Sequence, residues 1–102
     1  MKKYLLISHY NWDGDFGVNV SGPYDTEAQA LQRQKDFMEQ EIRGLWDQGE
    51  TVLINAQDLP NDVIDGLENP YLVEHYNESY IITQYGNSAM KHEEIIVKEI
   101  EV

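Results

Sequence analysis

The sequence contains no cysteine in its 102 residues. Disulfide bonds, thiolate metal sites and cysteine nucleophiles are therefore excluded, and such a composition is typical of a reducing compartment. Long apolar runs are also missing: the run at residues 4–7 is too short for a signal peptide, and nothing approaches the ~20 apolar residues of a membrane span. We therefore expect a cytoplasmic protein that does not bind a membrane.

Basic residues are scarce, with seven lysines and arginines against 19 aspartates and glutamates and a formal net charge of −12. A field of this sign opposes direct binding to a nucleic-acid backbone or to an anionic membrane surface. The excess of carboxylates leaves three roles open: solubility, attraction of a cationic partner protein, and cation binding.

Motifs for catalysis are lacking as well. None of the four serines lies in a Gly-x-Ser-x-Gly turn, and no glycine-rich loop for phosphate is present. Adjacent carboxylates such as Glu93 and Glu94 would project to opposite faces of a strand, so the two cannot act on one substrate atom. We expect no enzymatic activity and no cofactor.

A metal site is not indicated either. Asn11, Asp13 and Asp15 alternate like the opening of a calcium loop, which takes oxygen ligands from alternate positions. However, Gly14 lies between the two acids, and the twelfth loop position, where a bidentate glutamate is needed, is Gly22. We interpret this stretch as a hairpin turn whose carboxylates keep it in water.

The clearest element is an amphipathic helix predicted for residues 26–49. Thr26 and Gln29 match the capping-box pattern at its start, and Gly49 can take the left-handed conformation that closes a helix. At about 100° per residue, one arc roughly 100° wide is apolar and predicts the face toward the core. The residues of that arc are Ala28, Leu31, Met38, Ile42, Leu45 and Trp46, with Lys35 among them.

Two residues depart from the helical pattern. Phe37 projects outside the apolar arc, so either a neighbouring strand or loop covers it, or it is an exposed aromatic anchor for a partner. Gly44 indicates either an early end of the helix or the close approach of another backbone.

Strands are predicted on both sides of the helix. β-Branched and aromatic residues at 3–10 predict a central strand, and residues 16–20 predict a short second strand that completes a hairpin. Phe16, Val18 and Val20 alternate along this second strand and are expected on its buried face.

The part after the helix predicts about three more strands. The charges of the last strand are expected to place it near a sheet edge, where they resist pairing with other chains. Strands are expected at residues 51–55, 79–85 and 93–102, residues 71–76 can also be extended, and residues 56–70 form a connection with one helical turn at 61–66.

These elements predict one α+β domain over residues 1–102. The expected architecture is an antiparallel β-sheet of about four to five strands, in the order ββαβββ, with the long amphipathic helix packed across one face. The other face of the sheet is left with three alternatives: partly wet, covered by residues 56–70, or paired with a second subunit.

Acidic residues supply the candidate interaction surface. If they formed one continuous stripe with phosphate-like spacing, the chain would act as small phage or mobile-element inhibitors of restriction and CRISPR nucleases do, by occupying a nucleic-acid-binding groove. This comparison is with a functional class, since no motif identifies a family. The candidates are Asp13, Asp15, Asp58, Asp62, Asp65, Glu68, Glu93, Glu94, Glu99 and Glu101.

The sequence therefore predicts a small acidic, non-enzymatic protein that acts through protein–protein contact. Its sharpest version is a nucleic-acid-mimicking inhibitor, of bacterial or phage type, that binds a basic protein and no nucleic acid directly. A homodimer through an open sheet face or edge is the expected assembly. The alternative is an accessory domain that binds a small ligand in a cleft between helix and sheet.

Overall fold

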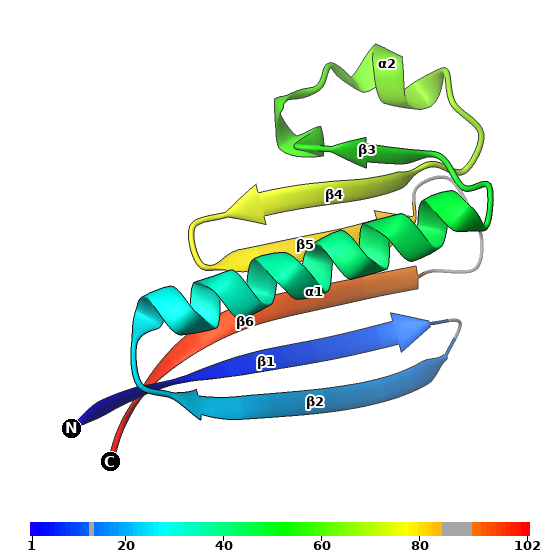
Figure 1. Ribbon diagram of the computed structural model, residues 1–102. Helices are drawn as coiled ribbons and strands as arrows, with labels where there is room; N and C mark the ends of the chain where they lie inside the picture. The colour runs from blue at the N-terminus through cyan, green and yellow to red at the C-terminus, as the bar shows by residue number, and fades with distance from the viewer. Residues whose placement is uncertain (13, 85–90) are drawn as a thin grey trace.

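The computed structural model describes residues 1–12, 14–84 and 91–102, and it contains a mixed β-sheet with one long helix across one face (Figure 1). In these residues the sheet has six strands. The elements are β1 (Lys2–Trp12), β2 (Asp15–Tyr24), α1 (Glu27–Asp47), β3 (Val52–Ile54), the 3-10 helix η1 (Ala56–Asp58), α2 (Asn61–Asp65), β4 (Tyr71–Tyr76), β5 (Ser79–Gln84) and β6 (Lys91–Glu101).

The strand order across the sheet is β2-β1-β6-β5-β4-β3. Every neighbouring pair is antiparallel except β3 and β4, which are parallel. The α+β class and the long helix across one face are thus as predicted, while the sixth strand and the parallel pair depart from the predicted antiparallel sheet. The pair is parallel because the connection through η1 and α2 returns the chain to the end of the sheet at which β3 begins.

The last strand, β6, lies in the middle of the sheet, so its predicted place near an edge is wrong. Its pairing with β5 runs from His92 to Ile96, whereas its pairing with β1 continues to Glu101. In the register described, the charged residues after Ile96 therefore flank β1 on one side and have no β5 partner on the other. The charged residues of β6 therefore coincide with a free edge, but only along that half of the strand.

Helix α1 begins and ends as predicted. The Thr26 side chain accepts a hydrogen bond from the backbone of Gln29, whose own side chain accepts one from the backbone of Thr26. These reciprocal bonds satisfy two amide groups that have no partner within the helix. Gly49, with φ of +80°, follows the C-cap residue Gln48. Gly44 neither ends the helix nor meets another backbone, because an added Cβ there would have open space around it.

The buried face of α1 is rotated from the predicted arc. Met38, Ile42 and Leu45 are buried as expected, but Trp46 is 52% exposed and Leu31 is half-buried. Ala28 and Lys35 are also exposed, and the buried set is completed by Ala30 and Gln34.

Gln34 explains the rotation. Gln34 is 1% exposed, and its side-chain amide donates to the backbone carbonyl oxygens of Glu78 and Ile95, at 2.8 Å each. The contact face of α1 therefore includes a polar residue that ties the helix to the sheet. A hydrophobic pattern cannot reveal such a residue, because a buried amide is tolerated only through its particular hydrogen bonds.

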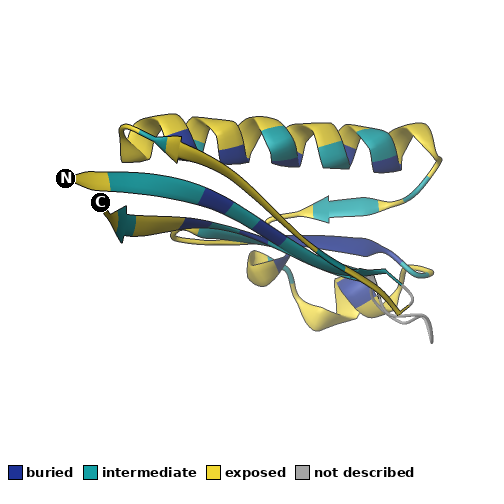
Figure 2. Ribbon diagram, turned by 90° about the horizontal axis from the view of Figure 1, so that it is seen from below, coloured by how far each residue is buried: buried dark blue, intermediate teal, exposed yellow. Residues whose placement is uncertain are grey.

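Two apolar cores lie on opposite faces of the sheet. The larger one lies between α1 and the sheet and includes Met38, Ile82 and Ile95. On the other face, Ala56 and Ile64 from η1 and α2 pack with residues of β3 and β4. Figure 2 shows α1 on one side of the sheet and α2 on the other. The connection thus covers the β3–β4 part of that second face.

The β2 side of the second face is different, and the prediction for it is wrong. Phe16, Val18 and Val20, which were expected on a buried face, are 73%, 68% and 59% exposed. Alternation along a strand shows which residues share a face, but it does not show which face a helix covers. Here α1 lies against the opposite face, on the side of Leu6 and Ser8.

Candidate interaction surface

Strand β2 is one of the two outer strands of the described sheet. It is ten residues long, whereas the strand at the other edge, β3, has three residues and continues into η1. Proteins protect an edge by making it short, by placing charged residues or proline on it, or by covering it. Between Asp15 and Asp25 the chain carries no charged residue, and its one proline, Pro23, lies near the end of the strand. The middle of β2 is therefore an unprotected edge.

Three apolar side chains project from this edge strand on the face away from α1. We call Phe16, Val18 and Val20 the β2 stripe. Isolated exposed apolar residues are normal on a protein surface, but three in a row along a free edge form a patch of the kind that marks contact sites.

Polar residues of β1 and β6 border the β2 stripe. Val18 pairs with His9, which pairs in turn with Glu94 of β6, and the His9 Nε2 atom lies 3.9 Å from a Glu94 carboxylate oxygen. A shallow hollow of about 470 Å³ runs along the border and includes Phe16 and His92 among its lining residues. The open face is therefore amphipathic, with an apolar margin at β2 and ionisable groups inward of it.

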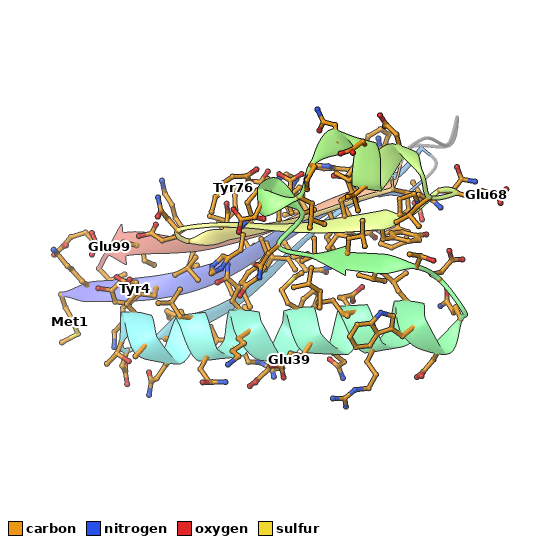
Figure 3. All side chains as sticks on the ribbon, turned by 90° about the horizontal axis from the view of Figure 1, so that it is seen from above. Met1, Tyr4, Glu39, Glu68, Tyr76 and Glu99 are labelled. Atoms are coloured by element: carbon orange, nitrogen blue, oxygen red, sulfur yellow. The ribbon has the colours of Figure 1, made fainter. Side chains whose placement is uncertain are left out.

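The predicted acidic surface is divided into separate groups. Four exposed residues lie along the connection between β3 and β4: Asp58, Asp62, Asp65 and Glu68. Glu68 and Glu99 lie toward opposite ends of the molecule (Figure 3). Asp15 begins β2, Glu94 lies on the open sheet face, and Asp13 falls outside the described residues.

The acids at the end of β6 are partly neutralised by the start of the chain. The N-terminal ammonium of Met1 lies 2.9 Å from the Glu101 carboxylate, and the Lys2 ammonium lies 3.7 Å from Glu99. Exposed pairs of this kind add little stability, but they lower the negative potential at that end. The candidates in the described residues therefore form no single patch, and the four on the connection are spread along it from η1 to the start of β4.

Glu93 does not belong to the surface, and its prediction as part of an acidic patch is wrong. It is 6% exposed, on the sheet face that α1 covers, and its Oε1 atom has no hydrogen-bond partner among the described residues. Burial raises the pKa of Glu93 to about 7, with a smaller contribution from the Glu41 carboxylate of α1. The sequence did hold a signal for this position, since Glu93 shares its strand face with the buried Ile95 and Val97.

Phe37 is likewise not an exposed anchor. It is half-buried and packs against the main core, as in the first of its two predicted alternatives. Phe16, on β2, is more exposed than any other aromatic residue in the described part of the chain. Sequence reasoning missed the β2 stripe, although the missing charge between Asp15 and Asp25 could have indicated it.

A cleft between helix and sheet does exist. It measures about 170 Å³ and lies between α1 and the strands β1 and β2, with Ser8 and Leu6 at its floor and Arg33 and Phe37 along its helix side. The Ser8 hydroxyl is buried without a hydrogen-bond partner in the described part of the chain. The volume is below the roughly 300–1,000 Å³ typical of small-molecule sites.

No group of three or more His, Cys, Asp or Glu side chains among the described residues is placed to hold a metal ion. No helix in the described ranges is both long and apolar enough to span a membrane.

Comparisons of the chain with protein-family models, with curated proteins and with solved structures gave no match.

Proposed function

We propose that this chain is a non-enzymatic protein that acts through protein–protein contact, and that its contact surface is the β2 stripe together with the free edge of β2. The observation that carries the proposal is the exposure of Phe16, Val18 and Val20 on an uncharged outer strand. An acidic protein of this size carries ample charge for solubility. The lack of charged residues is therefore a feature of this strand and not of the chain as a whole.

The energetics favour a strand-pairing contact over a purely apolar one. Fully burying a Val or Phe side chain is worth about 1.5–3 kcal/mol, so the exposed parts of the three side chains offer at most roughly 3–6 kcal/mol, and a strand paired with β2 covers only their flanks. Association itself costs roughly 4–15 kcal/mol. The stripe alone does not offset that cost. Backbone hydrogen bonds from a partner strand laid along β2 would supply the remainder, as in β-augmentation.

The acidic residues take a secondary part in this proposal. Their division into separate groups does not supply the continuous stripe that nucleic-acid mimicry needs, but a net charge of −12 still speeds the approach of a basic partner. The small-ligand alternative has less support, because the narrow cleft of about 170 Å³ is small for such a site. The larger hollow of about 700 Å³, between the start of α1 and residues of β5 and β6, is wide open to solvent.

An affinity capture experiment tests the proposal. The wild-type chain, the variant Phe16→Ser/Val18→Ser and the variant Asp62→Asn/Asp65→Asn are immobilised and exposed to extract of the cells that produce the chain, at about 0.1 M and 1 M salt. The Debye length falls from about 10 Å to about 3 Å between these concentrations, which screens exposed charges. We expect the captured proteins, this chain's own copies included, to persist at high salt and to disappear with the β2 variant.

The asparagine variant is the matched control, since it changes two exposed acidic residues of α2. It should retain the captured proteins. The opposite result would contradict the proposal and favour an electrostatic contact. In that case capture is lost with the asparagine variant and at high salt, but it is unchanged with the β2 variant. Circular dichroism spectra of all three proteins should coincide, because the altered side chains lie outside both cores.

A further inference from the structure

We propose that the partner strand on β2 is the β2 strand of a second copy of this chain, paired antiparallel about a twofold axis at Val18. The inference rests on the proposed function, because it names the occupant of the same surface. The supporting observations are the pattern of the strand, its charge, and the contrast between the two edges of the sheet.

The residue pattern is self-complementary. When two antiparallel copies pair with Val18 opposite Val18, Phe16 of each copy lies opposite Val20 of the other. Opposed residues share a face, so the two stripes join into one apolar surface on the side away from α1. Such an interface is isologous: every contact occurs twice, and the assembly closes as a dimer.

The charge pattern favours this arrangement of two copies over other arrangements of the same two chains. Each copy carries a net charge of −12, so two copies repel wherever their acidic surfaces meet. In the Val18-centred register, residues 16–20 bring no ionisable side chain into the interface, and Asp15 lies opposite Ser21. Two acidic chains can therefore approach along this segment without placing carboxylates opposite each other.

The face of β2 toward α1 is also compatible with this register. Tyr10 lies directly over Gly17, since an added Cβ at Gly17 would lie 2.2 Å from the tyrosine ring. Gly17 would lie opposite Asn19 of the second copy, a small polar residue that is exposed on this face. Gly17 thus has no side chain that could obstruct Asn19 of the second copy, and Tyr10 of the same chain covers the glycine.

The other edge of the sheet does not offer the same possibility. Strand β3 has three residues, and the chain leaves it directly for η1 and α2, which carry Asp58, Asp62 and Asp65. Pairing of two copies there would be short and would bring like charges together. The free half of β6 carries Lys98, Glu99 and Glu101, so in the described sheet β2 is the edge at which a second copy fits.

A single-cysteine experiment tests the inference, since the natural sequence has no cysteine. Residues directly opposite each other in an antiparallel pair have Cα atoms about 4.5–5.5 Å apart, which lies within the range of a disulfide. We expect Val18→Cys to form a disulfide-linked dimer upon mild oxidation. Gln40→Cys, on the exposed side of α1, is the matched control and should remain unlinked under the same conditions.

Analytical ultracentrifugation supplies the second measurement. The wild-type chain should sediment as a dimer, and Val18→Asp, which places two carboxylates opposite each other, should raise the dissociation constant at least about tenfold. Circular dichroism confirms folding of the variant. A monomeric wild type, or linkage of Val18→Cys no faster than that of Gln40→Cys, would overturn the inference.

The two proposals fail differently. If the wild type is monomeric and its captured proteins are still lost with the β2 variant, the proposed dimer is wrong but protein contact through β2 stands. A monomeric wild type whose capture is unaffected by the β2 variant overturns both.

Discussion

Met38→Ala should lower the free energy of unfolding by about 2–5 kcal/mol, as truncation of a buried methionine does. Met38 is 2% exposed and lies in the core between α1 and the sheet. Its side chain fills space that neighbouring residues cannot occupy without moving, so the substitution loses buried apolar area and leaves a cavity. Urea denaturation followed by circular dichroism measures the loss.

Trp46→Ala and Gln40→Ala are the controls for the Met38 prediction. The hydrophobic pattern placed Trp46 in the core, but the structure leaves it 52% exposed, so its replacement should cost about 1 kcal/mol or less. Gln40 lies on the outer side of α1 and should have a smaller effect. A loss at Trp46 as large as that at Met38 would mean that the buried face of α1 is the one the hydrophobic pattern predicted.

Glu93→Gln should stabilise the protein at pH 8 and make little difference at pH 4. The pKa of Glu93 is raised from its ordinary value of 4.5 to about 7, so the folded state binds a proton more tightly than the unfolded state. The contribution of Glu93 to stability is therefore fully present below pH 4.5 and is lost as the pH rises through 7. Glutamine remains neutral, so the variant avoids this loss.

Glu93→Gln should raise the free energy of unfolding at pH 8 by about 1–3 kcal/mol. The upper limit corresponds to the whole shift in the pKa of Glu93, and the lower limit allows for solvent screening. Urea denaturation of wild type and variant at pH 4, 6 and 8 measures it. Glu39→Gln, on the exposed side of α1, is the matched control and should leave the pH dependence unchanged (Figure 3). A difference between Glu93→Gln and wild type that stays constant over this pH range would show that Glu93 is not buried beneath α1.

Local rules predicted the limits of α1 well. The capping box at Thr26 and the left-handed Gly49 depend on the chemistry of a few neighbouring residues, which the sequence contains in full. The rotation of the helix is different, because it depends on hydrogen bonds from Gln34 to residues 44 and 61 positions further along the chain. No periodicity in α1 itself carries that information.

The sheet shows the same division between local and distant information. Alternation grouped Phe16, Val18 and Val20 correctly on one face, but the face covered by α1 is decided by how the helix crosses back over the strands. For Glu93 the local pattern was sufficient, because Ile95 on the same face of the strand is fully buried.

Amide hydrogen exchange across β2 tests the central claim, that a partner strand covers this edge. The measurement compares the wild type, at a concentration above the dissociation constant of the dimer, with the Val18→Asp variant. We predict slower exchange within Asp15–Tyr24 in the wild type and equal exchange in β3 at the other edge. The claim is contradicted if the amides of β2 exchange at the same rate in the two proteins and as fast as the amides of β3.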